Sequence, residues 1–370
     1  MRAKNEGETF EFRFFFVSYL KNKLRISAKF VIVRVIQTVT KEDFTMKEIK
    51  WAVLGCGVIA NEMAVALQKN GKNIYAVGNR THEKAAAFAE KYGIGKVYDD
   101  FHEMFTDPEV DVIYITTPHN THLGFMKEAI ANGKHILVEK SITLNSDELD
   151  EAIALAKEKG VIIGEAMTIY HMPIYKELKK ILDSGRLGRV NLITMNFGSF
   201  KEYNMKNRFF NRNLAGGAML DIGVYALSFI RWFFDSKPDQ LLSQVKPAPT
   251  GVDEQAGLLL TNQEGQMASV MLSLHSKQPK RGMVSCENGF IEIMEYPRAW
   301  EAKITDASTG ESEIIKAGDN ADALAYELAD MERAINGDAS AMHLDYTKDV
   351  MDLMTSFRRT WGYTYPEEEK

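Results

Sequence analysis

The stretch from Lys50 to Ala60 constrains the fold more than any other part of the sequence. A short apolar run is followed there by Gly55-Cys56-Gly57-Val58-Ile59-Ala60, and a helical pattern begins at once. This is a dinucleotide-binding fingerprint in its strand, turn and helix setting. Gly55 permits the sharp turn, Gly57 lets backbone N–H groups approach a pyrophosphate, and the small Ala60 lets the helix pack closely. Because the first N–H groups of a helix attract phosphate, we predict a dinucleotide site at this turn.

Apolar strands alternate with amphipathic helices between residues 49 and 165. The expected strands after the first are 73–78, 97–99, 110–115, 135–139 and 161–164. This alternation is typical of an α/β protein with a parallel, doubly wound (Rossmann) sheet. Ligands of such sheets bind beyond the carboxyl ends of the strands, so the residues that follow each strand are candidates for the site.

The pattern changes after about residue 168. We expect a long strand at 189–200, an apolar helix at 220–234, a strand-rich stretch at 240–315 and closing helices at 322–335 and 346–361. This predicts an α+β domain with a large, open, mainly antiparallel sheet and helices on one face.

The predicted organisation has three parts. Residues 1–45 form an N-terminal extension, 46–167 a Rossmann dinucleotide-binding domain, and 168–370 an α+β domain for substrate binding and oligomerisation. Met46 directly precedes the first strand, and we hypothesise that it is the functional start and that the extension has no role in the chemistry.

Composition narrows the class of partner. The net charge of the 370 residues is −6, and the sequence has no block of basic residues. Nucleic acid is therefore not expected as a binding partner. In the first 45 residues no uninterrupted apolar run approaches the roughly 20 residues of a membrane span, and no membrane association is expected. The only cysteines, Cys56 and Cys286, are far apart, and a reducing cytoplasm fits. His119 and His122 lack a suitably spaced carboxylate, so we predict no metal site.

Several motifs occur in a characteristic order over residues 46–362. They are the fingerprint, Thr117-Pro118 with His122, Glu139-Lys140, Gly164-Glu165-Ala166, and the run from Gly216 to Tyr225. This order resembles the glucose–fructose oxidoreductase / inositol dehydrogenase / rhizopine-catabolism (Gfo/Idh/MocA) family, and within it the dihydrodiol and D-xylose dehydrogenase branch. The resemblance implies hydride transfer between a nicotinamide and the CH–OH or C=O group of a sugar, polyol or diol. It also implies a homodimer or homotetramer paired through the second domain's sheet.

The resemblance implies a catalytic group of Lys140, Asp221 and Tyr225. Tyr225 is the candidate acid/base; a free tyrosine has a pKa near 10, and a neighbouring lysine ammonium would favour its phenolate. Asp221 lies four residues earlier, on the same helix face, where it could bind substrate or balance Lys140. Which of Lys140 and Tyr225 takes the proton stays open. In the plainer alternative, Tyr225 is only a residue of an amphipathic helix and Asp221 its N-cap.

Ser141 departs from the family pattern, which usually reads Glu-Lys-Pro with a cis peptide before proline. A cis bond before another residue costs about 2.5–4 kcal/mol. The loop is therefore expected to be either trans or strained.

Cofactor choice depends on the end of the second strand. NAD sites usually carry a carboxylate there, but this chain reads Asn79-Arg80-Thr81. Arg80 and Lys84 could bind a 2′-phosphate, or be solvated surface charges, and we predict NADP in preference to NAD. The predicted cofactor contacts are Gly55, Gly57, Val58, Ile59, Ala60, Asn79, Arg80, Lys84, Thr117, Pro118, Asn120, His122, Glu139 and Lys140. Glu165, Tyr170 and His171 are expected to line the substrate pocket.

Two alternative functions remain. The first is a glycosidase that retains NAD⁺ for transient oxidation, which the missing carboxylate disfavours. The second is a catalytically idle dinucleotide-binding sensor, for which Ser141 is the only support.

Overall fold

A computed structural model describes residues 48–369 of the chain. The predictions made for the extension 1–45 and for Met46 lie outside the described residues.

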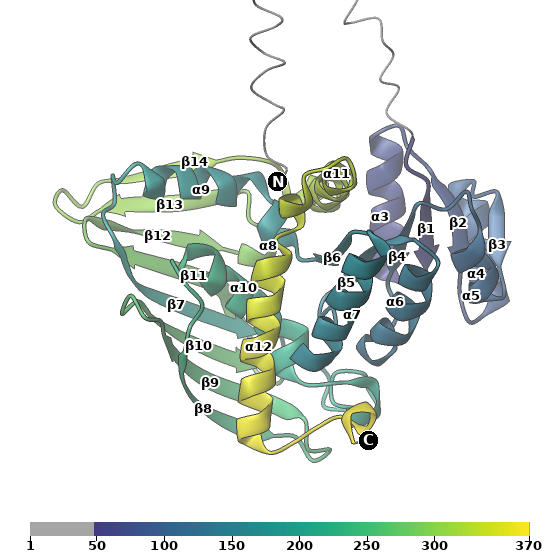
Figure 1. The fold of residues 1–370 in the computed structure, drawn as a ribbon. Helices are drawn as coiled ribbons and strands as arrows, with labels where there is room; N and C mark the ends of the chain where they lie inside the picture. Colours follow the sequence, from purple (N-terminus) through teal and green to yellow (C-terminus); the bar gives the residue numbers. More distant parts are fainter. Residues whose placement is uncertain (1–47, 370) are drawn as a thin grey trace, which may run out of the picture. The chain divides into compact units, whose positions relative to one another are not determined.

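The first sheet has six parallel strands in the order β3-β2-β1-β4-β5-β6 (Figure 1). Its strands are β1 (Trp51–Leu54), β2 (Ile74–Gly78), β3 (Lys96–Tyr98), β4 (Val112–Ile115), β5 (His135–Glu139) and β6 (Ile163–Ala166). The central strands β1 and β4 are buried along their whole length, as expected for a parallel sheet covered on both faces. The covering helices are α3 (Val58–Lys69), α4 (His82–Tyr92), α5 (Phe101–Thr106), α6 (His122–Ala131) and α7 (Ser146–Lys159). The predicted doubly wound α/β fold is confirmed.

After the short helices α8 (Thr168–His171) and α9 (Pro173–Asp183), a second sheet of eight strands follows in the order β14-β13-β12-β11-β7-β10-β9-β8. Its strands are β7 (Val190–Gly198), β8 (Gln240–Pro247), β9 (Asp253–Thr261), β10 (Met267–Ser273), β11 (Gln278–Cys286), β12 (Gly289–Met294), β13 (Glu301–Asp306) and β14 (Ser312–Lys316). The pair β7 and β10 is parallel, and the remaining pairs are antiparallel. The prediction of a mainly antiparallel sheet is thereby confirmed.

Helices cover one face of this second sheet. Helix α10 (Val224–Phe233) packs on β7 and β11, and α12 (Leu344–Trp361) contacts β8 (Figure 1). The contact with α10 is close: a Cβ added to Gly282 would lie 2.6 Å from the Phe229 ring. Large apolar side chains, among them Leu242 and Met271, are exposed on the sheet.

The predicted helix at 220–234 needs a correction. Residues Met219–Gly223 form a π-helical turn, and the α-helix begins only at Val224. The helical stretch Arg212–Phe233 is long and apolar enough to cross a membrane by composition, but 83% of its most apolar window is buried inside the protein. Its apolar character is therefore accounted for by the core.

A late segment of the chain completes the core of the first sheet. Helix α11 (Ala323–Ile335) packs on α3, and Leu328 and Met331 join the apolar cluster that contains Trp51. Met342 lies so close to β6 that a Cβ on Gly164 would be 2.4 Å from its methyl carbon. Residues beyond the predicted boundary at 168 thus stabilise the sheet that carries the fingerprint.

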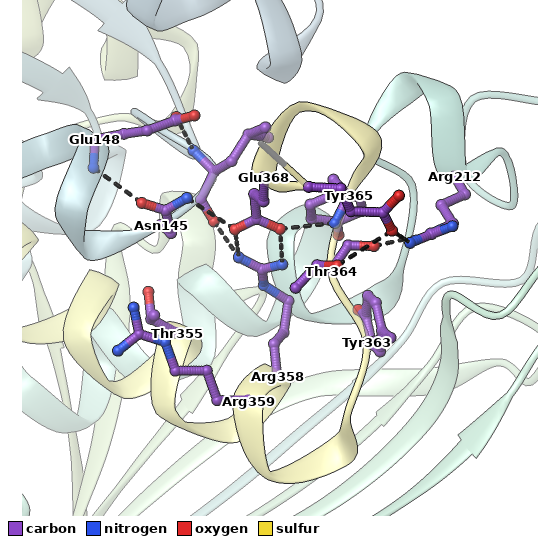
Figure 2. A network of polar contacts seen from close by, with 12 residues as sticks. Asn145, Glu148, Arg212, Thr355, Arg358, Arg359, Tyr363, Thr364, Tyr365 and Glu368 are labelled. Carbon is purple, nitrogen blue, oxygen red and sulfur yellow. Dashed lines mark hydrogen bonds and ion pairs between the residues drawn. The ribbon is translucent and has the colours of Figure 1, made fainter.

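The end of the chain also returns to the first sheet's helices. Arg358 of α12 forms a buried ion pair with Glu368, and Glu368 accepts a hydrogen bond from Asn145, the N-cap of α7 (Figure 2). Arg358 donates further to the Leu144 carbonyl. The C-terminal residues are therefore fastened between α12 and the start of α7.

Candidate active site

A cleft of about 460 Å³ brings the fingerprint turn together with the predicted catalytic group. It lies beyond the carboxyl ends of β1, β4 and β5, where a doubly wound sheet binds its ligands. The residues that line it are Gly57, Val58, Ile59, Thr116, Thr117, Pro118, His119, Glu139, Lys140, Arg208, Leu214 and Tyr225. A larger hollow of about 800 Å³ beside α3 shares Gly57 and Val58 but contains neither Lys140 nor Tyr225, so we place the chemistry in the smaller cleft.

The fingerprint has the geometry that a phosphate group requires. Gly55 has a φ of +108°, and a Cβ there would lie 2.4 Å from Thr116 Oγ1. Gly57 faces open space, because an added Cβ would meet nothing within 4 Å. Gly57 is also the N-cap of α3 and has no side chain to occupy the first N–H groups. The turn therefore offers both the first backbone N–H groups of α3 and open space in front of them, and this fits a dinucleotide pyrophosphate.

Asp221 and Tyr225 both contact Lys140, although Lys140 comes from a distant segment, and Lys140 and Tyr225 line the cleft. Lys140 Nζ donates a hydrogen bond of 2.8 Å to the Asp221 backbone carbonyl and lies 3.7 Å from Asp221 Oδ1. The same ammonium lies over the Tyr225 ring, 4.7 Å from its centroid. The helix junction at 219–225 presents Asp221 and Tyr225 together to the end of β5.

The loop after Lys140 is held by its own backbone and by Ser141. The Lys140–Ser141 peptide is cis, so the trans alternative for this loop is wrong. Ser141 Oγ donates to the Leu220 carbonyl at 3.0 Å, which ties the loop to the turn that carries Asp221. A proline could not make that bond.

Buried polar side chains also hold the loop after Lys140 in place. Glu165 accepts hydrogen bonds from Ile142 N at 3.0 Å and from Thr347 Oγ1 at 3.2 Å. His122 Nε2 lies 2.8 Å from the Thr117 carbonyl, and its Nδ1 faces backbone carbonyls of the loop after Lys140. Burial raises the pKa of Glu165 to about 7. These residues position Lys140 without entering the cleft.

Burial and charge set the protonation of the catalytic group. Burial raises the pKa of Tyr225 above its ordinary value, and the nearby Lys140 ammonium offsets this only in part. Burial alone would lower the pKa of Lys140, but Tyr225, Asp221 and Glu139 leave it raised. For Asp221, burial is outweighed by Lys140 and Arg208, so its pKa is lowered. Near neutral pH the group is therefore a phenol, an ammonium and a carboxylate, and the Lys140 charge acts on Tyr225 in the predicted direction, toward the phenolate.

Two further titratable groups line the cleft. His119 Nε2 faces the Lys140 carbonyl at 3.1 Å, and burial, with the charges of His122 and Lys140, lowers the His119 pKa to about 3. Glu139 accepts a hydrogen bond from Tyr114, and burial raises its pKa. Among residues 48–369, no group of three or more His, Cys, Asp or Glu side chains could hold a metal ion.

The residues predicted to choose the cofactor are exposed beside the fingerprint. Arg80 and Lys84 make no ion pair within the described part of the chain. The charge of Lys84 reaches Cys56, whose pKa it lowers against the larger effect of burial. Asn79 donates to the Thr81 carbonyl at 3.0 Å and shapes the turn that carries Arg80.

Some residues that were predicted to contact the cofactor or the substrate lie outside the cleft. Asn120 turns to the end of the chain, donating to Glu367 at 2.7 Å. Glu165, Tyr170 and His171 are buried and do not line the cleft.

Sequence reasoning missed other residues of the cleft. They are Thr116, His119, Arg208 and Leu214. Thr116 follows β4 and could have been found by the same strand-end rule. His119 was considered only as a metal ligand, and the loop around 208 has no periodic pattern that would single out one residue.

The doubly wound sheet, its open glycine turn and the lysine-centred cleft define a nucleotide-binding oxidoreductase. Residues 49–167 match the family model described as oxidoreductase family, NAD-binding Rossmann fold, and residues 175–292 match the GFO/IDH/MocA C-terminal domain. The chain belongs to the Gfo/Idh/MocA family of oxidoreductases.

Relatives and solved structures agree with this family. The chain is 31% identical to a trans-1,2-dihydrobenzene-1,2-diol dehydrogenase of Xenopus tropicalis, over 66% of this chain and 74% of the relative. Identity to the mouse (Mus musculus) enzyme of that name is 26%, over 87% and 99% of the two chains. The fold is similar to that of KijD10, a 3-ketoreductase from Actinomadura kijaniata solved with NADP and TDP-benzene, with a TM-score of 0.75, 20% identity and coverage of 84% and 97%.

Proposed function

We propose that this protein is an NADP-dependent dehydrogenase or reductase that interconverts the CH–OH and C=O groups of a sugar, polyol or diol. One observation carries the proposal: Lys140 and Tyr225 line the same cleft as the open fingerprint turn, and the buried Asp221 carboxylate lies 3.7 Å from the Lys140 ammonium. A binding-only sensor has no need of this convergence. The names of the Xenopus and mouse relatives support a vicinal diol or a related polyol as the substrate class.

The cofactor would be held mainly by backbone. The N–H groups after Gly57 would bind the pyrophosphate, while Arg80 and Lys84 would bind a 2′-phosphate. When bound, the nicotinamide supplies or accepts the hydride. Both cations are exposed and without an ion-pair partner in the described residues, and KijD10 was solved with NADP. These observations support NADP over NAD.

The chain's own residues would handle the proton. In carbonyl reduction the Tyr225 hydroxyl donates a proton to the oxygen of the substrate, and Lys140 stabilises the negative charge left behind. Asp221 holds the Lys140 ammonium in place through its carbonyl and carboxylate. Alcohol oxidation runs the same path in reverse and requires Tyr225 to lose its proton first.

Pairing of two copies would use the uncovered face of the second sheet. Leu242, Leu259 and Met271 line a shallow depression of about 670 Å³ there, and all three are exposed. We propose a homodimer or homotetramer formed through this face, in a reducing compartment such as the cytoplasm, where the unpaired Cys56 and Cys286 stay reduced. Light scattering of wild type and Leu242→Glu would test it: the variant should have half the mass or less.

The experiment that tests the function is fluorescence titration with NADPH and NADH side by side. We expect NADPH to bind at least tenfold more tightly, about 1.4 kcal/mol. Arg80→Gln and Lys84→Gln should each reduce that preference, while Lys127→Gln on the distant α6 should not. Tighter NADH would overturn the cofactor choice, and binding of neither would remove the dinucleotide site.

A further inference from the structure

Arg208 brings a second positive charge to the catalytic carboxylate. Its Nη2 lies 3.5 Å from Asp221 Oδ1, the oxygen that Lys140 Nζ approaches at 3.7 Å. One carboxylate oxygen is therefore shared by two cations. Arg208 lines the cleft, and its side chain is 58% exposed. More than half of the Arg208 side chain is thus open to solvent at the cleft.

Lys201 and Arg208 both contact one aromatic ring, that of Phe209. The Lys201 ammonium and the Arg208 guanidinium each lie 4.1 Å from the centroid of the Phe209 ring. Burial lowers the pKa of Lys201, and the charges of Arg208 and Lys140 lower it further against the opposing effect of Asp221. Within residues 48–369 the Lys201 ammonium forms no ion pair. Arg208, at the cleft, thus shares its carboxylate with Lys140, and the nearby Lys201 forms no ion pair among the described residues.

The acidic groups nearby do not balance this charge. Asp221 is shared, and Glu139 is the one carboxylate among the described residues that line the cleft. Lys140, Arg208 and Lys201 therefore exceed the carboxylates available to them. A planar guanidinium with an ammonium beside it is the arrangement that binds carboxylate or phosphate groups.

We infer that the substrate carries an anionic group, a carboxylate or a phosphate, next to its reacting diol, and that Arg208 and Lys201 bind this group. The inference rests on the proposed oxidoreductase function and narrows its substrate class to acidic polyols and sugars. A solvated surface cluster is the plainer reading, but it does not explain why Arg208 and Lys201 converge on one ring beside Asp221.

The test compares three ligands on one three-carbon diol: glycerol, which is neutral, glycerate, which adds a carboxylate, and glycerol 3-phosphate. Saturation-transfer NMR in phosphate-free buffer at constant ionic strength measures their affinities, with and without NADPH. We expect at least one anion to bind tenfold or more tightly than glycerol, and the stronger anion identifies the group. Equal binding of all three overturns the inference.

Variants assign the effect to the two cations. Arg208→Gln and Lys201→Gln should each reduce the ratio of anion affinity to glycerol affinity at least threefold. The matched control is Arg186→Gln, on the loop after α9, where Arg186 pairs with Glu313. If the preference survives both variants, or if Arg208→Gln weakens NADPH instead, the inference is wrong.

A failure of the proposed oxidoreductase function can be distinguished from a failure of the anion inference. Loss of NADPH binding by the wild-type chain overturns the dinucleotide site but leaves the anion preference measurable on the chain alone.

Discussion

The Lys140 ammonium lies over the face of the Tyr225 ring, 4.7 Å from its centroid, while its hydrogen bond goes to the Asp221 carbonyl. A cation in this position stabilises negative charge on the ring without taking the phenol proton. This geometry supports the proposal that Tyr225 exchanges the proton and that the Lys140 charge assists it.

Removing either group should therefore lower turnover. We expect Tyr225→Phe and Lys140→Met each to lower kcat about 10²- to 10⁴-fold, the usual contribution of a positioned proton donor or charge. For Tyr225→Phe, NADPH affinity should remain within threefold of wild type, and Lys127→Met, an exposed lysine on α6, should be fully active. A Tyr225→Phe variant with near wild-type kcat would instead assign the proton to Lys140.

The two directions of the reaction should respond differently to pH. The pKa values of Tyr225 and Lys140 are both raised, so both groups are protonated near pH 7. Carbonyl reduction needs the protonated form and should stay level from pH 6 to 9. Alcohol oxidation needs the deprotonated form, so kcat/KM should rise up to tenfold per pH unit over that range. Steady-state rates in both directions check this, and an oxidation rate that is flat with pH would exclude Tyr225 as the base.

Glu165 should make folding stability depend on pH. Its pKa is raised to about 7 in the folded protein from an ordinary value of 4.5. Its contribution is therefore fully present below pH 4.5 and is lost as the pH rises through 7. Glu165→Gln keeps an acceptor for Ile142 N and removes the titration. Between pH 5 and pH 8.5 the unfolding free energy of the variant should therefore rise, relative to that of wild type, by up to about 3 kcal/mol.

Urea unfolding of both proteins at the two pH values measures this difference. All other groups titrate in both chains, so the change between pH values isolates Glu165. Glu151→Gln, an exposed carboxylate on α7, is the matched control and should shift by less than about 0.5 kcal/mol. Parallel stability curves for wild type and Glu165→Gln would contradict the prediction.

Local pattern predicts the part of the site that the parallel sheet brings together. The turn at Gly55 and the position of Lys140 follow from strand ends that share one edge, and the Asp221–Tyr225 spacing is a property of one helix junction. Arg208 depends on a loop without periodicity. Contacts between residues far apart in the sequence could not be predicted from local pattern either. For example, Trp51 Nε1 donates a hydrogen bond to Glu332, 281 residues away.

The residues misplaced by the sequence show the same limit. Tyr170 follows β6 closely, and the strand-end rule therefore puts it in the pocket. Instead its ring packs against Trp232, His343 and Tyr346, which come from far later in the chain. Burial among partners of distant sequence position cannot be inferred from a local motif.

The C-terminal residues provide a matched pair of arginines for a last prediction. Arg358 binds both oxygens of Glu368 at 2.7 and 2.8 Å, and the two side chains are only 3% and 10% exposed (Figure 2). The adjacent Arg359 pairs with Asp147 at 2.8 Å, but both of those side chains are largely exposed. The two ion pairs have similar distances, but the Arg358 pair is buried and bidentate, whereas the Arg359 pair is exposed and has a single contact.

Breaking the buried pair should therefore cost far more than breaking the exposed one. Glu368→Gln leaves the Arg358 charge buried without its partner, and we expect unfolding free energy to fall by about 3–5 kcal/mol. Asp147→Asn breaks the exposed pair and should cost at most about 1 kcal/mol. Chemical unfolding of both variants measures the two losses. Replacing both buried partners, Arg358→Met with Glu368→Leu, should recover much of the stability, because no charge is then left unpaired. Equal losses of unfolding free energy in the two single variants would mean that the buried pair does not hold the end of the chain. A double variant no more stable than Glu368→Gln would show that the loss comes from packing and not from the unpaired charge.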